Sequence, residues 1–134
     1  APEASAQALE EMVATGEAML HELGLPYRVL QLCTGDLGFG SMVSYDLEVW
    51  SAGCQEWLEV SSISDYGSFQ ARRCGIRFRR EAGAATEFVH TLNGSGLALP
   101  RTVIAILENG QRSDGSIALP DALHDRMGTD AIRP

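Results

Sequence analysis

Val89–Gln111 has the sequence VHTLNGSGLALPRTVIAILENGQ, in which three local patterns follow one another. A strand-like run that begins at Phe88 breaks at Asn93-Gly94-Ser95-Gly96, and an apolar segment starts at Arg101. Glycines on both sides of a small hydroxyl residue let the backbone approach a ligand closely, because no Cβ stands in the way. An arginine at the start of the next segment offers a fork of donors suited to a phosphate or a carboxylate. The pattern alone fits a nucleotide site and an ordinary loop equally well.

The segments before this stretch predict one helix and then several antiparallel strands. Ser5–Leu23 has apolar residues at helical spacing, and the Gly24 that follows is typical of a helix end. Strand-like runs, separated by glycine-containing turns, come next at Tyr27–Cys33, Tyr45–Trp50 and Trp57–Ser62. The middle run alternates strictly, so that Asp46 and Glu48 share one face, which borders either solvent or a ligand.

The later segments predict further helices and complete the pattern of elements. The β-branched residues of Arg101–Asn109 also suit a buried strand, but its length and the stop at Gly110 favour a helix. Three more elements are expected, a short helix at Phe69–Arg73, a strand at Thr86–Leu92 and a short helix from Pro120-Asp121 to about Gly128. We therefore expect an α+β fold, an antiparallel β-sheet flanked by helices, as one domain over residues 1–134.

The composition of the chain limits its expected location and its expected contacts with membranes and nucleic acid. No apolar run approaches the roughly 20 residues of a membrane span, so we expect no membrane association. The number of cysteines is odd and their spacing is wide, at Cys33, Cys54 and Cys74, which argues against a disulfide framework and a zinc site. This pattern predicts a reducing, cytoplasmic location. We expect the three thiols to be small buried hydrophobic groups. The net charge of −8 predicts repulsion from nucleic acid at large, so any RNA contact must be local.

One cluster of arginines stands out in this acidic sequence. It consists of Arg72, Arg73, Arg77, Arg79 and Arg80, and all ten basic residues of the chain are arginines. Two interpretations are open, contact with RNA and ion pairing with the acids at Asp46, Glu48 and Glu59. Of the two, we expect ion pairing with these acids.

Five segments together carry a resemblance to a known family. HTLNGSGLALPRTVIAILENGQ resembles the motif 3 segment of seryl-tRNA synthetases, the class II enzymes that activate serine with ATP. The segments that resemble the same family in the same order are TGDLGFG (34–40), YDLEVW (45–50), EVSSISD (59–65) and FQARR (69–73). The resemblance extends from the first helix to about Met127, and it implies the C-terminal part of a class II synthetase catalytic domain.

The resemblance also implies roles for individual residues. Glu59, Val60, Ser61 and Ser62 are expected to touch ATP, with Glu59 and Ser62 also holding Mg²⁺, a hard cation that takes oxygen ligands. Arg101 matches the motif 3 arginine, expected against the adenine and phosphates of ATP, and with Glu59 it is expected to be catalytic. Ser95 is assigned to the serine substrate, with Asn93 as a nearby supporting group. Strict alternation would place Glu59 and Ser62 on opposite faces, so a shared site requires the strand to bulge or end near Ser61.

Two functions of different classes follow from the resemblance. In the first, the chain is part of a seryl-tRNA synthetase that makes seryl-adenylate and transfers serine to tRNA(Ser), as a homodimer when full length. In the second, it is a stand-alone serine- or nucleotide-binding domain, or a synthetase-like paralogue that does not charge tRNA. The second stays open because the chain has no counterpart of motif 1, of motif 2 or of the N-terminal tRNA-binding arm of the family.

Overall fold

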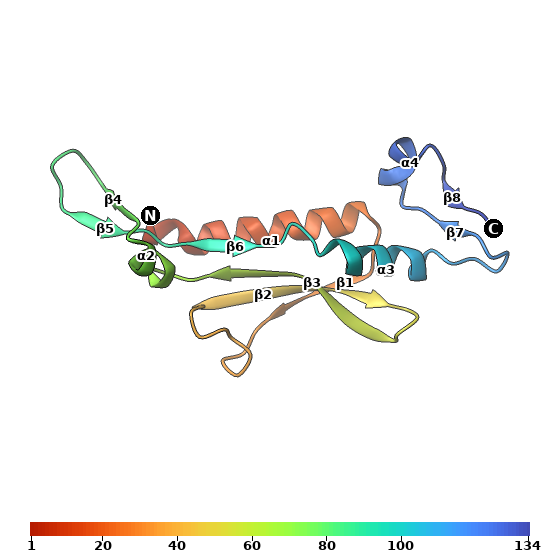
Figure 1. Cartoon of the computed structure of the whole chain (residues 1–134), viewed down its shortest axis with the longest axis horizontal. Coiled ribbons are helices and arrows are strands. Elements are labelled where there is room, and N and C mark those ends of the chain that lie inside the picture. Colours follow the sequence, from red (N-terminus) through yellow and green to blue (C-terminus); the bar gives the residue numbers. More distant parts are fainter.

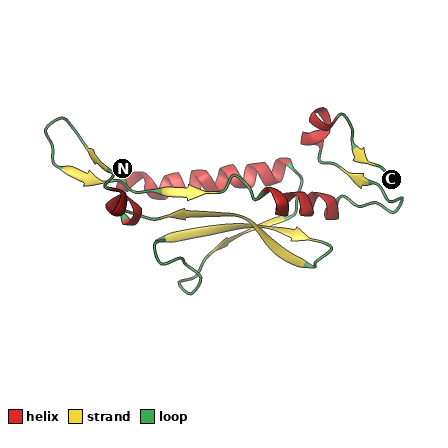
Figure 2. Cartoon of the chain, viewed as in Figure 1, coloured by secondary structure: helices red, strands yellow, loops and turns green.

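The computed structural model describes residues 1–134, and its main element is a four-stranded antiparallel sheet (Figures 1 and 2). The sheet has the strand order β1-β2-β3-β6. Its strands are β1 (Tyr27–Gln31), β2 (Val43–Ser51), β3 (Glu56–Asp65) and β6 (Leu92–Gly94). The two central strands, β2 and β3, form a long hairpin that positions the other elements. Their alternating side chains give the sheet two different faces.

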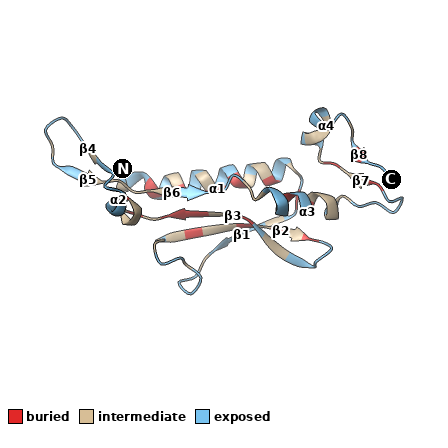
Figure 3. Ribbon diagram, viewed as in Figure 1, coloured by how far each residue is buried: buried red, intermediate tan, exposed pale blue.

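One face of the sheet is covered by the helices α1 (Ser5–Glu22) and α3 (Leu99–Asn109). The core that they bury consists of Leu9, Val13, Leu20, Leu25, Leu47, Val49, Val60, Ile63 and Ala105. Gly16 allows α1 to lie close to the sheet, because a Cβ added there would collide with the Leu47 side chain. Full burial of a side chain such as Leu47 stabilises the fold by about 1.5–3 kcal/mol. Figure 3 shows the buried segments concentrated on these central strands and on α1.

Smaller elements extend from the two ends of this layer. At the end near the N-terminus lie the 3₁₀ turn Pro2–Ala4, α2 (Phe69–Cys74) and the hairpin of β4 (Arg77–Arg79) and β5 (Thr86–Phe88) (Figure 1). At the other end lie α4 (Asp121–Met127) and the paired strands β7 (Ile117–Ala118) and β8 (Ala131–Ile132). No helix in the structure has both the length and the apolar character needed to cross a membrane.

Most of the elements predicted from the sequence are confirmed. The first helix, α3 and α4 match their predicted ranges within two residues, and Gly24 and Gly128 follow α1 and α4 with positive φ angles of 63° and 66°. The α+β class with an antiparallel sheet is also confirmed. At Gly128 the left-handed backbone ends the helix, and a residue with a side chain would be strained there.

Four predictions are wrong. The strand predicted at Thr86–Leu92 is two separate strands, because the backbone of Thr91 bonds to Tyr66 and Gly67 in a turn and does not continue the β4–β5 ladder. Asn93-Gly94, predicted as a break, belongs to β6 and pairs with Ser64 and Ile63. The three cysteines are exposed instead of buried.

The predicted ion pairing of the arginine cluster with the sheet acids is the fourth error. Arg80 pairs with Glu3 and Glu87, and no member of the cluster pairs with Asp46, Glu48 or Glu59. The reason is geometric, because the hairpin that carries Arg77, Arg79 and Arg80 extends from the end of the sheet.

Candidate functional site

The face of the sheet that the helices leave open forms a cleft of about 500 Å³. Side chains from β1, β2 and β3 form its floor, and the connections that follow β1 and β3 form its rim. The residues that line it are Leu30, Leu32, Asp36, Gly38, Ser41, Ser44, Asp46, Glu48, Glu59, Ser62, Ser64 and Tyr66. Two of the sequence-predicted site residues, Glu59 and Ser62, are therefore in the same cavity.

A β-bulge in β3 brings Glu59 and Ser62 to one face. Glu48 pairs with Glu59 and the adjacent Leu47 pairs with Ser61, so Val60 is an extra residue with no partner on β2. An extra residue shifts the side-chain alternation by one position, and Glu59 and Ser62 then point the same way. The bulge predicted as a condition for a shared site is present.

The two residues between them face the opposite way and have structural contacts. Val60 is fully buried in the core beneath α1 and α3. Ser61 is also buried, and its Oγ donates a hydrogen bond of 2.7 Å to the carbonyl oxygen of Ser95. Any contact that these two residues make with a ligand in the cleft must therefore come from their main-chain atoms.

Arg101 is held against the bulge by its own side chain. Pro100 stands in the first turn of α3, where its missing N–H costs nothing. Before it, the Ala98 N–H donates to the Val60 carbonyl oxygen at 2.6 Å, which fixes the start of the helix on β3. Arg101 Nη1 then donates to the Glu59 carbonyl oxygen at 2.6 Å. Glu59 lines the cleft, and the exposed Arg101, which is not among the lining residues, is held against the Glu59 backbone.

The other end of α3 is tied to the β2–β3 hairpin. Glu108 accepts hydrogen bonds from Ser51 Oγ at 2.5 Å and from the Gly53 N–H at 3.0 Å. These two bonds lower the pKa of the Glu108 carboxyl below its usual value, and the bond from Ser51 has the larger effect. Asn109 Nδ2 adds a bond of 2.8 Å to the Trp50 carbonyl oxygen. Sequence reasoning missed this anchor, because residues 57 positions apart carry no shared local pattern.

Asn93 and Ser95 lie on different sides of β6. Asn93 pairs with Ser64, a residue of the cleft, and directly opposed residues of an antiparallel pair share a face. Ser95 instead lines a smaller cavity of about 170 Å³ beside α1, with Met12, Thr15, Gly16, Met19, Ile63, Gly94 and Gly96. The structure therefore brings Glu59, Ser62 and Asn93 to one face of the sheet, and it holds Arg101 against the Glu59 backbone. Ser95 is joined to them only through its bond with Ser61.

The cleft is acidic, and most of its carboxylates have no ion-pair partner. It contains the carboxylates of Asp36, Asp46, Glu48 and Glu59, of which only Glu48 is ion-paired, with Arg28 at 2.5 Å. Asp46 Oδ1 is buried without a hydrogen-bond partner, an uncommon condition for a carboxylate oxygen. No three histidine, cysteine or acidic side chains lie close enough to hold a metal ion by themselves.

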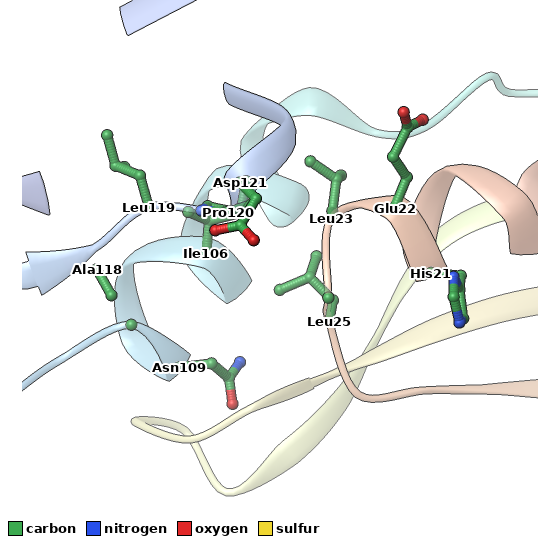
Figure 4. Close-up of a pocket in the computed structure, with 12 residues that line it drawn as sticks. His21, Glu22, Leu23, Leu25, Ile106, Asn109, Ala118, Leu119, Pro120 and Asp121 are labelled. Atoms are coloured by element: carbon green, nitrogen blue, oxygen red, sulfur yellow. The ribbon is translucent and has the colours of Figure 1, made fainter. Parts of the chain in front are cut away.

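A second cavity of about 420 Å³ lies between the end of α1, the end of α3 and the segment before α4 (Figure 4). Figure 4 shows Leu25 and Asn109 beside the space, and His21 directed away from it. None of the residues predicted for the site lines it. The open face of the sheet is therefore the better candidate site.

Comparison with known proteins identifies the family of this chain. The family model of the class II core domain of tRNA synthetases (G, H, P, S and T) matches residues 1–110. The chain belongs to the class II tRNA synthetase core domain family. The serine–tRNA ligase of Chloroflexus aurantiacus is 58% identical over 127 residues, which are 95% of this chain and 30% of the relative. The resemblance to seryl-tRNA synthetases predicted from the motifs is confirmed.

Two solved structures of synthetases superpose on nearly the whole chain. Seryl-tRNA synthetase from Pyrococcus horikoshii, complexed with ATP, gives a TM-score of 0.95 at 41% identity and covers 99% of this chain and 30% of its own. Cytoplasmic serine–tRNA ligase from Naegleria fowleri, in complex with AMP, gives a TM-score of 0.87 at 33% identity. This match covers 96% of the present chain and 31% of the Naegleria chain. The chain thus has the class II core fold and spans about a third of the length of the relatives that it matches.

Proposed function

We propose that this chain is the C-terminal part of the catalytic domain of a seryl-tRNA synthetase, and that its cleft takes part in activating L-serine with ATP. The observation that carries the proposal is the hydrogen bond from Arg101 Nη1 to the Glu59 carbonyl oxygen, at 2.6 Å. This bond joins α3, the helix of motif 3, to β3, the strand from which Glu59 and Ser62 extend into the open cleft. Two similar synthetases are described as complexes with ATP and with AMP, which supports nucleotide binding by this chain.

The reaction needs positioning and charge compensation more than covalent help from the protein. The carboxylate of serine attacks the α-phosphorus of ATP, a bond to the α-phosphate forms, and the bond to the pyrophosphate leaving group breaks. Negative charge develops on the phosphate oxygens as this occurs, and fixed donors stabilise it. Arg101 supplies such donors, because one Nη is held by the Glu59 carbonyl oxygen while the other N–H groups of the guanidinium remain available.

The residues of the bulge fit a magnesium ion that arrives with ATP. Mg²⁺ is usually held by one or two carboxylates together with substrate phosphates and water. Glu59 and Ser62 offer one carboxylate and one hydroxyl on a common face, and no larger cluster of protein ligands exists. A magnesium ion held by Glu59 and Ser62 would reduce the repulsion between the phosphates and the acids of the cleft.

Serine is proposed to bind next to β6, where Asn93 faces the cleft. Ser95 is proposed as a substrate contact from the motif 3 resemblance, although it lines the smaller cavity beside α1 and not the cleft. The Ser61 bond to its carbonyl oxygen fixes the backbone at this position. A site that hydrogen-bonds a substrate hydroxyl rejects analogues without it by large factors. Serine specificity would thus depend on a short strand held by β3.

The remaining steps belong to the full-length protein. We propose transfer of serine to tRNA(Ser), a homodimer and a cytoplasmic location, with tRNA held mostly by regions outside these 134 residues.

Serine-dependent exchange between ATP and pyrophosphate in the full-length protein tests the proposal. We expect exchange with serine and charging of tRNA(Ser). Exchange without any charging would favour the synthetase-like paralogue, and absence of exchange with serine would reject the proposed function.

A further inference from the structure

The helix α3 is attached to the β2–β3 hairpin at both of its ends. At its start, Arg101 Nη1 donates to the Glu59 carbonyl oxygen at 2.6 Å. Near its end, the Glu108 carboxylate accepts hydrogen bonds from Ser51 Oγ and from the Gly53 N–H. Arg101 and Glu108 are seven residues apart, so they lie on the same side of the helix and about 10 Å apart along its axis. One helix therefore connects the arginine proposed to bind ATP with the turn of the hairpin.

The contact between Glu108 and the hairpin turn is formed entirely by groups of this chain. Ser51 is fully buried, and its Oγ accepts from the Cys54 N–H at 3.2 Å, which leaves the hydroxyl hydrogen for the carboxylate. Gly53 is needed for the close approach, because a Cβ at this position would lie 2.6 Å from Glu108 Oε1. The contact is therefore complete within these 134 residues and does not depend on an exposed surface.

The packing of α3 on the sheet leaves its direction less closely fixed than these bonds do. The buried residues of the helix are Thr102 and Ala105, and small side chains make few contacts that oppose a tilt. Asn109 Nδ2 bonds to the Trp50 carbonyl oxygen at the same end, but this bond joins two neutral groups. Hydrogen bonds to a carboxylate are roughly twice as strong as neutral ones. The Glu108 carboxylate is therefore the main restraint on this end of the helix.

We propose that Glu108 is a positioning residue for Arg101, an inference that rests on the proposed function. The bonds of Glu108 fix the tilt of α3, and this tilt sets the direction in which the Arg101 guanidinium meets ATP. A misplacement of about 1 Å can slow a reaction by about 100-fold even when its cause lies far from the chemistry. Arg101 is sensitive to such a shift, because one Nη already holds the Glu59 carbonyl oxygen and the planar guanidinium then fixes the direction of the other donors.

The test compares Glu108→Ala, Glu108→Gln and Ser51→Ala in the full-length protein with Asp114→Ala as the matched control. Asp114 also accepts from a serine hydroxyl and a backbone N–H, at 2.7 Å and 2.9 Å, but both belong to Ser116, two residues later. Its loss removes the same kind of bonds without releasing α3 from the hairpin. Serine-dependent exchange between ATP and pyrophosphate is measured with varied ATP and with varied serine, and each variant is also made in an Arg101→Ala background.

We expect Glu108→Ala to lower kcat/KM for ATP by about 10- to 100-fold and to leave the KM for serine within about twofold of the wild type. Glu108→Gln keeps an oxygen that can accept both bonds, so it should recover most of this loss. Ser51→Ala should act in the same direction as Glu108→Ala but more weakly, because the bond from Gly53 remains.

The Arg101→Ala background separates positioning from stability. There Glu108→Ala should change kcat/KM for ATP by less than about twofold, since residues that act through one contact are not additive. Asp114→Ala should lower the melting temperature and leave the exchange constants within about twofold of the wild type.

Two outcomes would overturn the inference. If Glu108→Ala lowers the melting temperature and leaves kcat/KM for ATP unchanged, Glu108 only stabilises the fold. If it slows exchange equally with and without the Arg101 side chain, it does not act through Arg101. Should Glu108→Ala fail to fold, Ser51→Ala gives the same comparison.

The proposed function fails separately, if the wild type shows no exchange with serine. The same set of variants is then compared by the dissociation constant of ATP, measured by calorimetry. A Glu108→Ala effect on this constant that disappears in the Arg101→Ala background would still support positioning, and a wild type that does not bind ATP would reject both proposals.

Discussion

Replacement of Arg101 by lysine tests whether the site needs the fork of an arginine or only a positive charge. In the structure one Nη of Arg101 is used to hold the Glu59 carbonyl oxygen, and the rest of the guanidinium is free for ATP. Lysine has a single nitrogen at the end of a flexible chain, so it cannot keep both contacts in a fixed geometry. The loss is one hydrogen bond of a charged group, which is worth about 1.5–3 kcal/mol.

That loss corresponds to a decrease of about 13- to 160-fold in kcat/KM for ATP. The assay is serine-dependent exchange between ATP and pyrophosphate by the full-length protein, with varied ATP at saturating serine. Arg126→Lys, a change of the same type on exposed α4, serves as the control. Because Arg101 is exposed, its replacement should lower the melting temperature by only a few degrees. If Arg101→Lys retains exchange within twofold of the wild type, the bidentate role of this side chain is refuted.

Three further predictions follow from the same contacts. Glu59→Ala removes the carboxylate proposed to hold magnesium and should slow exchange by at least about 100-fold, whereas an unchanged rate would exclude that role. Ser95→Ala should raise the KM for serine by about 2- to 13-fold with a smaller effect on ATP, and an equal effect on both substrates would reject its role in serine binding. The pKa of the Glu108 carboxyl is lowered mainly by its bond from Ser51 and to a smaller extent by its bond from Gly53. The ionised carboxylate therefore stabilises the fold at pH values above the unfolded pKa of about 4.5, and this stabilisation is lost as the pH falls through the lower pKa of the folded state. The difference in melting temperature between wild type and Glu108→Gln should therefore shrink from pH 7 to pH 3, and a constant difference would contradict this assignment.

The parts of the fold that depend on local patterns were predictable from the sequence. α1 and α3 have apolar residues at helical spacing, and their ends carry glycines. The shared face of Asp46 and Glu48 follows from strict alternation, and the structure places both side chains in the cleft. Even the bulge could be stated as a condition, since Glu59 and Ser62 can share a face only if one residue of β3 is extra. In these cases residues close together in the sequence determine the local structure.

The parts that depend on distant contacts could not be predicted in the same way. The strand expected at Thr86–Leu92 looks continuous in sequence, but the backbone of Thr91 pairs with the turn after β3. The arginine cluster looked complementary to the acids of the sheet, yet α2 and the β4–β5 hairpin carry its members at the end of the sheet. The position of Ser95 beside α1 likewise depends on the bond to Ser61, 34 residues earlier.

The bulge at Val60 explains why α3 is attached to β3 without using the side chains of Glu59 and Ser62, which we propose for the site. The extra residue turns Val60 into the core and leaves its carbonyl oxygen for the Ala98 N–H, while the Glu59 carbonyl oxygen accepts from Arg101. Both bonds to α3 therefore come from main-chain atoms of β3. The Glu59 carboxylate and the Ser62 hydroxyl are consequently not needed to hold the helix, and they remain free for a ligand in the cleft.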